Sequence, residues 1–98
     1  MVASSPTQEQ VDQVAATLAP DVVRIKITPD EDWDGDPANY FRVILSDDVF
    51  RSGRLGEVTT RVRETFDKIF GLWASDRIPY FRFRSESDQA KLRQASWE

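Results

Sequence analysis

The chain has 98 residues, enough for one small domain with a single core. Its composition, 31% charged and 40% hydrophobic, is ordinary for a soluble globular protein, and no apolar run reaches the roughly 18 residues of a membrane span. Cysteine and histidine are both absent, which excludes disulfides, thiolate or imidazole metal sites, cysteine nucleophiles and histidine general bases. We therefore expect a non-enzymatic protein with no cofactor and no metal. The amino terminus lacks the basic start and apolar core of a secretory signal, so we expect a cytoplasmic location.

Charge is distributed unevenly along the chain. Residues 1–50 carry three basic and ten acidic side chains, whereas residues 51–98 carry ten basic and seven acidic ones. The net charge of −4 argues against non-specific coating of nucleic acid, although a local basic patch is compatible with it.

The first half of the sequence predicts one helix and two strands. After a flexible start over residues 1–4, Ser5 can cap a helix that begins at Pro6, with Gln8 completing a capping box and Pro20 ending the helix. Residues 22–27 and 40–45 alternate between apolar and polar side chains, which is typical of strands with one buried face. The acidic stretch between Pro29 and Pro37 predicts a long loop.

The second half predicts a turn or short helix near residues 47–50, a long helix, a third strand and a last short helix. The long helix spans residues 55–70, ends at Gly71, and has an apolar stripe formed by Leu55, Val58, Val62, Phe66, Ile69 and Phe70. The third strand covers residues 78–84, and Ser85 can cap a helix over residues 86–94. We expect Trp97 to anchor the end of the chain.

These elements predict an α+β fold in one domain over residues 5–98. Three strands and two main helices form a two-layer sandwich in the order α-β-β-α-β-α, with both main helices on one face of the sheet. A helical crossover leads to the third strand and is expected to be right-handed if that strand is parallel to its neighbour. The strand order stays open.

The other face of the sheet is the candidate binding surface. The alternation places these side chains on it: Arg24, Lys26, Tyr40, Arg42, Ile44, Tyr80, Arg82 and Arg84. Arginine and tyrosine together suit phosphates, stacked bases or an acidic protein. Two alternatives remain, namely an ordinary solvated face and a face covered by a partner subunit or by the C-terminal tail.

The acidic loop partly matches a calcium-binding loop. Its aspartates fall at loop positions one, three and five and a glycine at position six, as Asp30, Asp32, Asp34 and Gly35. Phe41 stands where the bidentate glutamate belongs, so a solvated turn is the simpler interpretation. Trp33 in this loop either anchors a partner or folds back onto the core. Elsewhere, Gly53 and Gly56 match neither a P-loop nor a dinucleotide fingerprint.

Two resemblances add to this interpretation. The segments over residues 32–43 (Asp-Trp-Asp-Gly-Asp-Pro-Ala, then Tyr-Phe-Arg-Val) and 83–97 (Phe-Arg-Ser-Glu-Ser to Trp97) resemble small bacterial proteins encoded beside HEPN-domain, toxin-like proteins. That resemblance implies a toxin–antitoxin or related two-component role. The element order is similar to that of type II KH-like domains of ribosome-associated factors, which implies RNA binding. We expect the chain to lack the Gly-x-x-Gly clamp of KH domains, and its net negative charge also departs from that family.

The resulting hypothesis is an interaction module, antitoxin-like or an adaptor, that binds a protein partner or a second copy of itself and no membrane. The predicted binding residues are Arg24, Lys26, Arg42, Arg82 and Arg84 as charge contacts, Tyr40 and Tyr80 as apolar anchors, and Trp33 as a secondary contact. The alternative is a KH-like RNA- or DNA-binding domain that uses the same face.

Overall fold

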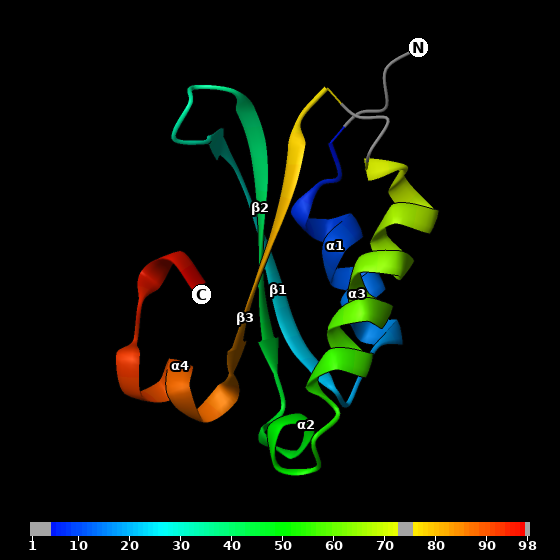
Figure 1. Ribbon diagram of the computed structural model, residues 1–98, viewed down its shortest axis with the longest axis vertical. Coiled ribbons are helices and arrows are strands. Elements are labelled where there is room, and N and C mark those ends of the chain that lie inside the picture. Colours follow the sequence, from blue (N-terminus) through cyan, green and yellow to red (C-terminus); the bar gives the residue numbers. More distant parts are fainter. Residues whose placement is uncertain (1–4, 73–75, 98) are drawn as a thin grey trace.

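The computed structural model describes residues 5–72 and 76–97, so the expectation for residues 1–4 lies outside the described part. The elements are α1 (Gln8–Thr17), β1 (Val22–Glu31), β2 (Pro37–Leu45), α2 (Asp47–Arg51), α3 (Leu55–Phe70), β3 (Ile78–Ser85), α4 (Glu86–Leu92) and the 3₁₀-helix η2 (Ala95–Trp97). The sheet order is β1-β2-β3, with β1 antiparallel and β3 parallel to β2. Figure 1 shows α1 and α3 on one side of the sheet and α4 on the other. The α+β class and the order α-β-β-α-β-α are confirmed.

Helix α1 begins two residues later than the sequence predicts. Thr7 is the N-cap, because its hydroxyl accepts a hydrogen bond from the Gln10 N–H (3.2 Å) while the Gln10 side chain accepts one from the Thr7 N–H (2.9 Å). The sequence offers this capping box and the one at Ser5 and Gln8 equally well. The second is excluded because Gln8 uses its side chain to bind β1.

Strands β1 and β2 are longer than predicted, and the loop between them covers only residues 32–36. The prediction that the first strand ends before Pro29 is wrong. Pro29 lies inside β1, opposite Asn39, on an outer strand of the sheet. An outer strand tolerates proline where the missing N–H would face away from the ladder, so the pairing continues to Glu31 and Pro37.

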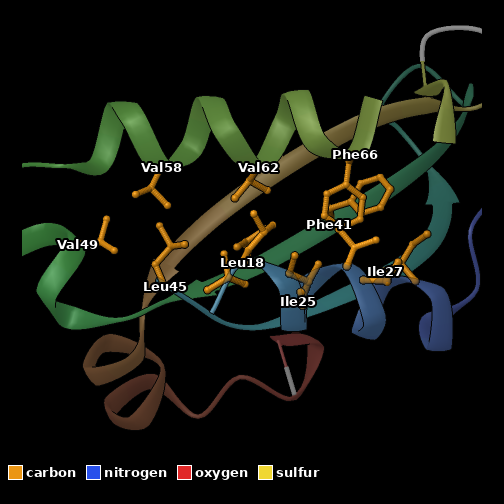
Figure 2. Close-up of a cluster of buried hydrophobic side chains, with 14 of the residues drawn as sticks. Leu18, Ile25, Ile27, Phe41, Leu45, Val49, Val58, Val62 and Phe66 are labelled. Atoms are coloured by element: carbon orange, nitrogen blue, oxygen red, sulfur yellow. The ribbon is translucent and has the colours of Figure 1, made fainter. Parts of the chain in front are cut away.

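Helix α3 has the predicted bounds, and Gly71 ends it in the left-handed conformation (φ 60°), with its N–H donating to the Asp67 carbonyl at 2.8 Å. The buried part of the apolar stripe on α3 is narrower than predicted. Val58, Val62 and Phe66 are fully buried, whereas Ile69 is 55% exposed. Figure 2 shows these three side chains directed toward Ile25, Phe41 and Leu45.

An aromatic cluster connects α3 to the sheet. The Phe41 ring lies 5.3 Å from that of Phe66 and 4.8 Å from that of Phe81, measured between centroids. Phe41 and Phe66 have no exposed surface. Contacts of this kind stabilise a core through buried apolar area and ring geometry together.

Phe66→Ala should therefore lower the free energy of unfolding by about 3–5 kcal/mol, because it leaves a cavity between α3 and β2. Ile69→Ala on the same helix should change it by less than about 0.5 kcal/mol, because that side chain is largely in solvent. Urea unfolding of both variants checks this expectation, and equal losses would contradict it.

Asp21 connects the turn after α1 to the start of α3. Its carboxylate accepts hydrogen bonds from Arg54 at 3.0 and 3.1 Å and from Arg61 at 2.6 Å. Arg54 also donates to Asp48 at 2.9 Å. The hydrogen bonds from Arg54 and then Arg61 hold the pKa of Asp21 below its ordinary value, although burial opposes them.

A lowered folded-state pKa gives stability that is present above the unfolded value of 3.8 and is lost as the pH falls through the folded value. Asp21→Asn should therefore be less stable than the wild type at pH 7, and this difference should shrink below pH 3.8. Thermal unfolding of both proteins between pH 7 and pH 2 checks the expectation. A difference in stability that does not change with pH would contradict it.

Candidate functional site

The strand registers bring the predicted face together. Even-numbered residues of β2, of β3 and of β1 from Arg24 onward share the face opposite α1 and α3, in rows that run across the sheet. The bulge before Arg24 reverses the alternation, so Val22 is buried in the core and Val23, predicted to face inward, is 42% exposed. These rows are Thr28, Tyr40 and Tyr80; then Lys26, Arg42 and Arg82; then Arg24, Ile44 and Arg84. All eight strand residues predicted for this face therefore lie side by side. Their role in binding a partner stays a prediction.

One end of this face is covered by residues 86–97, which we call the C-terminal arm. Its contacts centre on Arg84. The Arg84 guanidinium carbon lies 4.2 Å from the centroid of the Trp97 ring, and its nitrogens donate to the side-chain oxygens of Gln89 (2.7 Å) and Gln94 (2.8 Å). Figure 1 shows the arm folding back along the sheet on the side away from α3. The expected anchoring of Trp97 is confirmed, since the residue is 8% exposed.

The arm contacts or covers three of the residues predicted to lie on the open face. Arg24 donates to the carbonyl of Trp97 at 3.4 Å, and Lys26 donates to that of Ala95 at 3.3 Å. Ile44 was expected to face outward, but it is 1% exposed and borders a hollow lined by residues of α4. The expectation of an open face is therefore wrong at this end, and the alternative of cover by the C-terminal tail is confirmed there, since burial of an apolar side chain such as Ile44 adds stability.

The other end of the face is uncovered within the described residues. There Trp33, Tyr80, Tyr40 and Arg42 follow one another, with ring centroids 6.0 Å apart for Trp33 and Tyr80 and 5.3 Å apart for the stacked tyrosines. The Arg42 guanidinium lies 5.4 Å from the Tyr40 centroid. We call these four residues and the exposed Arg82 the aromatic–basic strip. Trp33 is 78% exposed, so the expected fold-back onto the core is excluded.

Asp32 fixes the loop that carries Trp33. One of its carboxylate oxygens accepts hydrogen bonds from the N–H groups of Asp34 (2.9 Å) and Asp36 (3.0 Å), and the other accepts one from the Tyr80 hydroxyl (3.1 Å). Burial disfavours the charged form of Asp32, but these hydrogen bonds outweigh it and place its pKa below the ordinary value. Burial and then the bond to Asp32 raise the pKa of Tyr80. The loop and the sheet face are thus held to each other.

The acidic loop brings three carboxylates together but does not follow the calcium-binding pattern. The carboxylates of Asp32, Asp34 and Asp36 lie within 4.8 Å of one another, whereas Asp30 of the predicted calcium pattern lies in β1. Both oxygens of Asp32 already accept hydrogen bonds, and Phe41, at the position of the expected glutamate, is fully buried. The loop therefore departs from the calcium-binding pattern at Asp30 and at Phe41.

A Gly-x-x-Gly sequence runs from Gly53, in the turn after α2, to Gly56, in the first turn of α3. The prediction that the chain lacks such a sequence is therefore wrong. In KH domains such a loop clamps the backbone of four nucleotides. Figure 1 places this turn at the α2 end of the molecule, away from the loop over residues 32–36. It is therefore separate from the aromatic–basic strip.

Comparisons of the chain with protein-family models, with curated proteins and with solved structures find no match. The resemblances to HEPN-associated proteins and to KH-like domains therefore stay predictions. No helix among the described residues is long and apolar enough to cross a membrane.

Trp97→Ala should release the C-terminal arm while the sheet and α3 stay folded, because it removes the ring against Arg84. Limited proteolysis should then cleave residues 86–97 at least tenfold faster than in the wild type. Leu92→Ala is the matched control, because that arm residue is 56% exposed and should leave the rate unchanged. Equal cleavage rates in the wild type and Trp97→Ala would contradict the assignment of Trp97 as the anchor.

Proposed function

We propose that this chain is a small non-enzymatic interaction module that binds a protein partner through the aromatic–basic strip. An antitoxin-like or adaptor role fits this activity. The single observation that carries the proposal is Trp33, which is 78% exposed and yet lies in a loop fixed by hydrogen bonds.

An exposed, pre-positioned tryptophan suits a binding anchor. Tryptophan and arginine dominate the energetics of protein interfaces, because each buries a large area and keeps a polar group available. The loop around Trp33 is ordered through Asp32, and Asp32 is bound to Tyr80. Binding would therefore lose little conformational entropy at this position.

The charges next to the rings favour an acidic partner surface. Arg42 lies opposite Arg82 in the register, and Lys26 lies opposite Arg42 on the other side. The Nη1 atom of Arg42 is buried and has no hydrogen-bond partner among the described residues. A carboxylate brought by a partner would compensate this group after a small rotation of the side chain.

RNA or DNA binding is the second candidate function, and the Gly-x-x-Gly turn over residues 53–56 is the observation in its favour. One feature of the strip speaks against base stacking there: the Tyr40 and Tyr80 rings already stack on each other. A nucleic acid held by the Gly-x-x-Gly turn would use a different surface from the protein partner.

Affinity capture from a lysate of the cells that encode the protein tests both functions. Wild type should retain one protein partner, and Trp33→Ala and the double variant Arg42→Glu/Arg82→Glu should each lose at least tenfold of it. The matched controls are Phe50→Ala, which removes another exposed aromatic, and Arg51→Glu/Lys68→Glu, which reverses two cations outside the strip. All variants are first shown to be folded by circular dichroism.

Retention of the partner by the strip variants would overturn the proposal. Capture of nuclease-sensitive nucleic acid, lost in Gly56→Asp, would establish the second candidate instead. Gly56 is suited to this test because a Cβ added there meets no atom of another segment within 4 Å. Nucleic-acid binding should also fall steeply with salt, in proportion to the phosphates neutralised, whereas binding to a protein through an aromatic anchor should fall less.

A further inference from the structure

The two outer edges of the sheet differ in whether their outward backbone groups form hydrogen bonds. On β1, the Gln8 side chain accepts a hydrogen bond from the Ile27 N–H (3.0 Å) and donates one to the Ile25 carbonyl (2.7 Å). This amide therefore takes the place of a neighbouring strand. Pro29 and a bulge between Val22 and Arg24 further interrupt the same edge.

On β3, the outward backbone groups are those of Phe81 and Phe83. The Gln8 contacts show that the backbone N–H and C=O groups of odd-numbered β1 residues point away from β2, so the backbone groups of even-numbered β1 residues bond to even-numbered residues of β2. The backbone groups of odd-numbered β2 residues therefore point toward β3. Because β3 is parallel and in register, they bond to even-numbered residues of β3, and the backbone groups of odd-numbered β3 residues point outward. Pro79, which has no N–H, fits this pattern. Among the described residues, no group forms a hydrogen bond with the outward N–H and C=O groups of Phe81 and Phe83.

The side chains beside this edge indicate what could pair with it. On the strip side, Arg82 is exposed next to Arg42, and no acidic residue belongs to the strip. On the helix side, Phe81 and Phe83 are half-buried, and Phe81 borders a hollow of about 230 Å³ between β3 and α3. Leu72 and Pro79 line this hollow together with Arg63 and Asp67, and the Arg63 guanidinium lies 5.1 Å from the Phe83 centroid. An added strand would thus meet cations on one side, and apolar surface bordered by Arg63 and Asp67 on the other.

We propose that the free edge of β3 binds an extended segment of the partner protein as a fourth strand, with acidic side chains toward Arg42 and Arg82 and apolar side chains toward Phe81. The inference rests on the proposed function and names the chemistry of the partner. Strand addition of this kind gains affinity from main-chain hydrogen bonds and specificity from alternate side chains. A second copy of the chain fits less well, because antiparallel pairing of two β3 strands brings arginines close to one another.

The test uses a ten-residue peptide of alternating Glu and Val as the probe, with amide exchange followed by NMR. In the free protein, the Phe81 and Phe83 amides should exchange faster than those of Arg82 and Arg84. With the peptide bound, they should slow at least tenfold. Arg82→Glu should weaken binding at least tenfold, whereas Lys68→Glu, on the exposed side of α3, should not.

Two further peptides separate backbone pairing from simple charge attraction. One carries N-methyl groups on every Val nitrogen and the other on every Glu nitrogen, so that one of them must lose the hydrogen bonds to β3 while keeping its side chains. At least one should bind tenfold more weakly than the parent peptide. Equal binding of all three peptides, or no binding of the parent peptide at millimolar concentration, would overturn the inference.

Other occupants give distinct results, each of which would also overturn it. A dimer by light scattering, with slow Phe81 and Phe83 amides in the absence of peptide, would identify a second copy. Slowing of the same amides by a ten-nucleotide oligothymidylate alone would identify a nucleic acid. A partner that is captured through Trp33 but leaves these amides unchanged would refute strand addition and leave the proposed function intact.

Discussion

The contacts of Arg84 determine which part of the second sheet face is available. A three-stranded sheet with two helices on one side leaves its other face uncovered. Here Arg84 holds the C-terminal arm over one end through the Trp97 ring and two glutamine side chains. Ile44 is buried as a result, while Tyr40, Tyr80 and Trp33 at the far end stay outside the arm. The aromatic–basic strip is therefore what the arm leaves uncovered.

The sheet edges show the same division between closed and available surface. The backbone groups of Ile25 and Ile27 are satisfied by the Gln8 side chain, whereas those of Phe81 and Phe83 have no such cover among the described residues. Natural proteins protect edges that would otherwise pair with other chains. An edge left open beside exposed arginine and tyrosine side chains is thus a candidate for controlled pairing. The aromatic–basic strip includes residues of β2 and β3, and the open edge belongs to β3, so these two candidate features adjoin each other.

Sequence reasoning predicted most of the fold and all five residues of the aromatic–basic strip, but not which end of the basic face is covered. Local periodicity predicted α3 with its correct bounds and the alternation that puts Arg42 and Arg82 on one face. It failed where two local signals competed, as with the two capping boxes before α1, and where tertiary position overrode a local rule, as with Pro29 inside an outer strand. It offered cover by the C-terminal tail only as an alternative and placed Ile44 on the outside, because no pattern within a strand indicates which end of the face a distant segment will cover.

By itself, therefore, the sequence determined the class of fold, the order of its elements and the side chains on each sheet face, except at the bulge that buries Val22 and exposes Val23. These follow from helix and strand periods, which depend on neighbouring residues alone. Only the tertiary structure decided the strand order, the closed and open edges, and the end of the basic face that the C-terminal arm covers. Those features depend on contacts such as Gln8 with Ile27 and Arg84 with Trp97, whose partners are chosen by packing in three dimensions and leave no periodic signal in the chain.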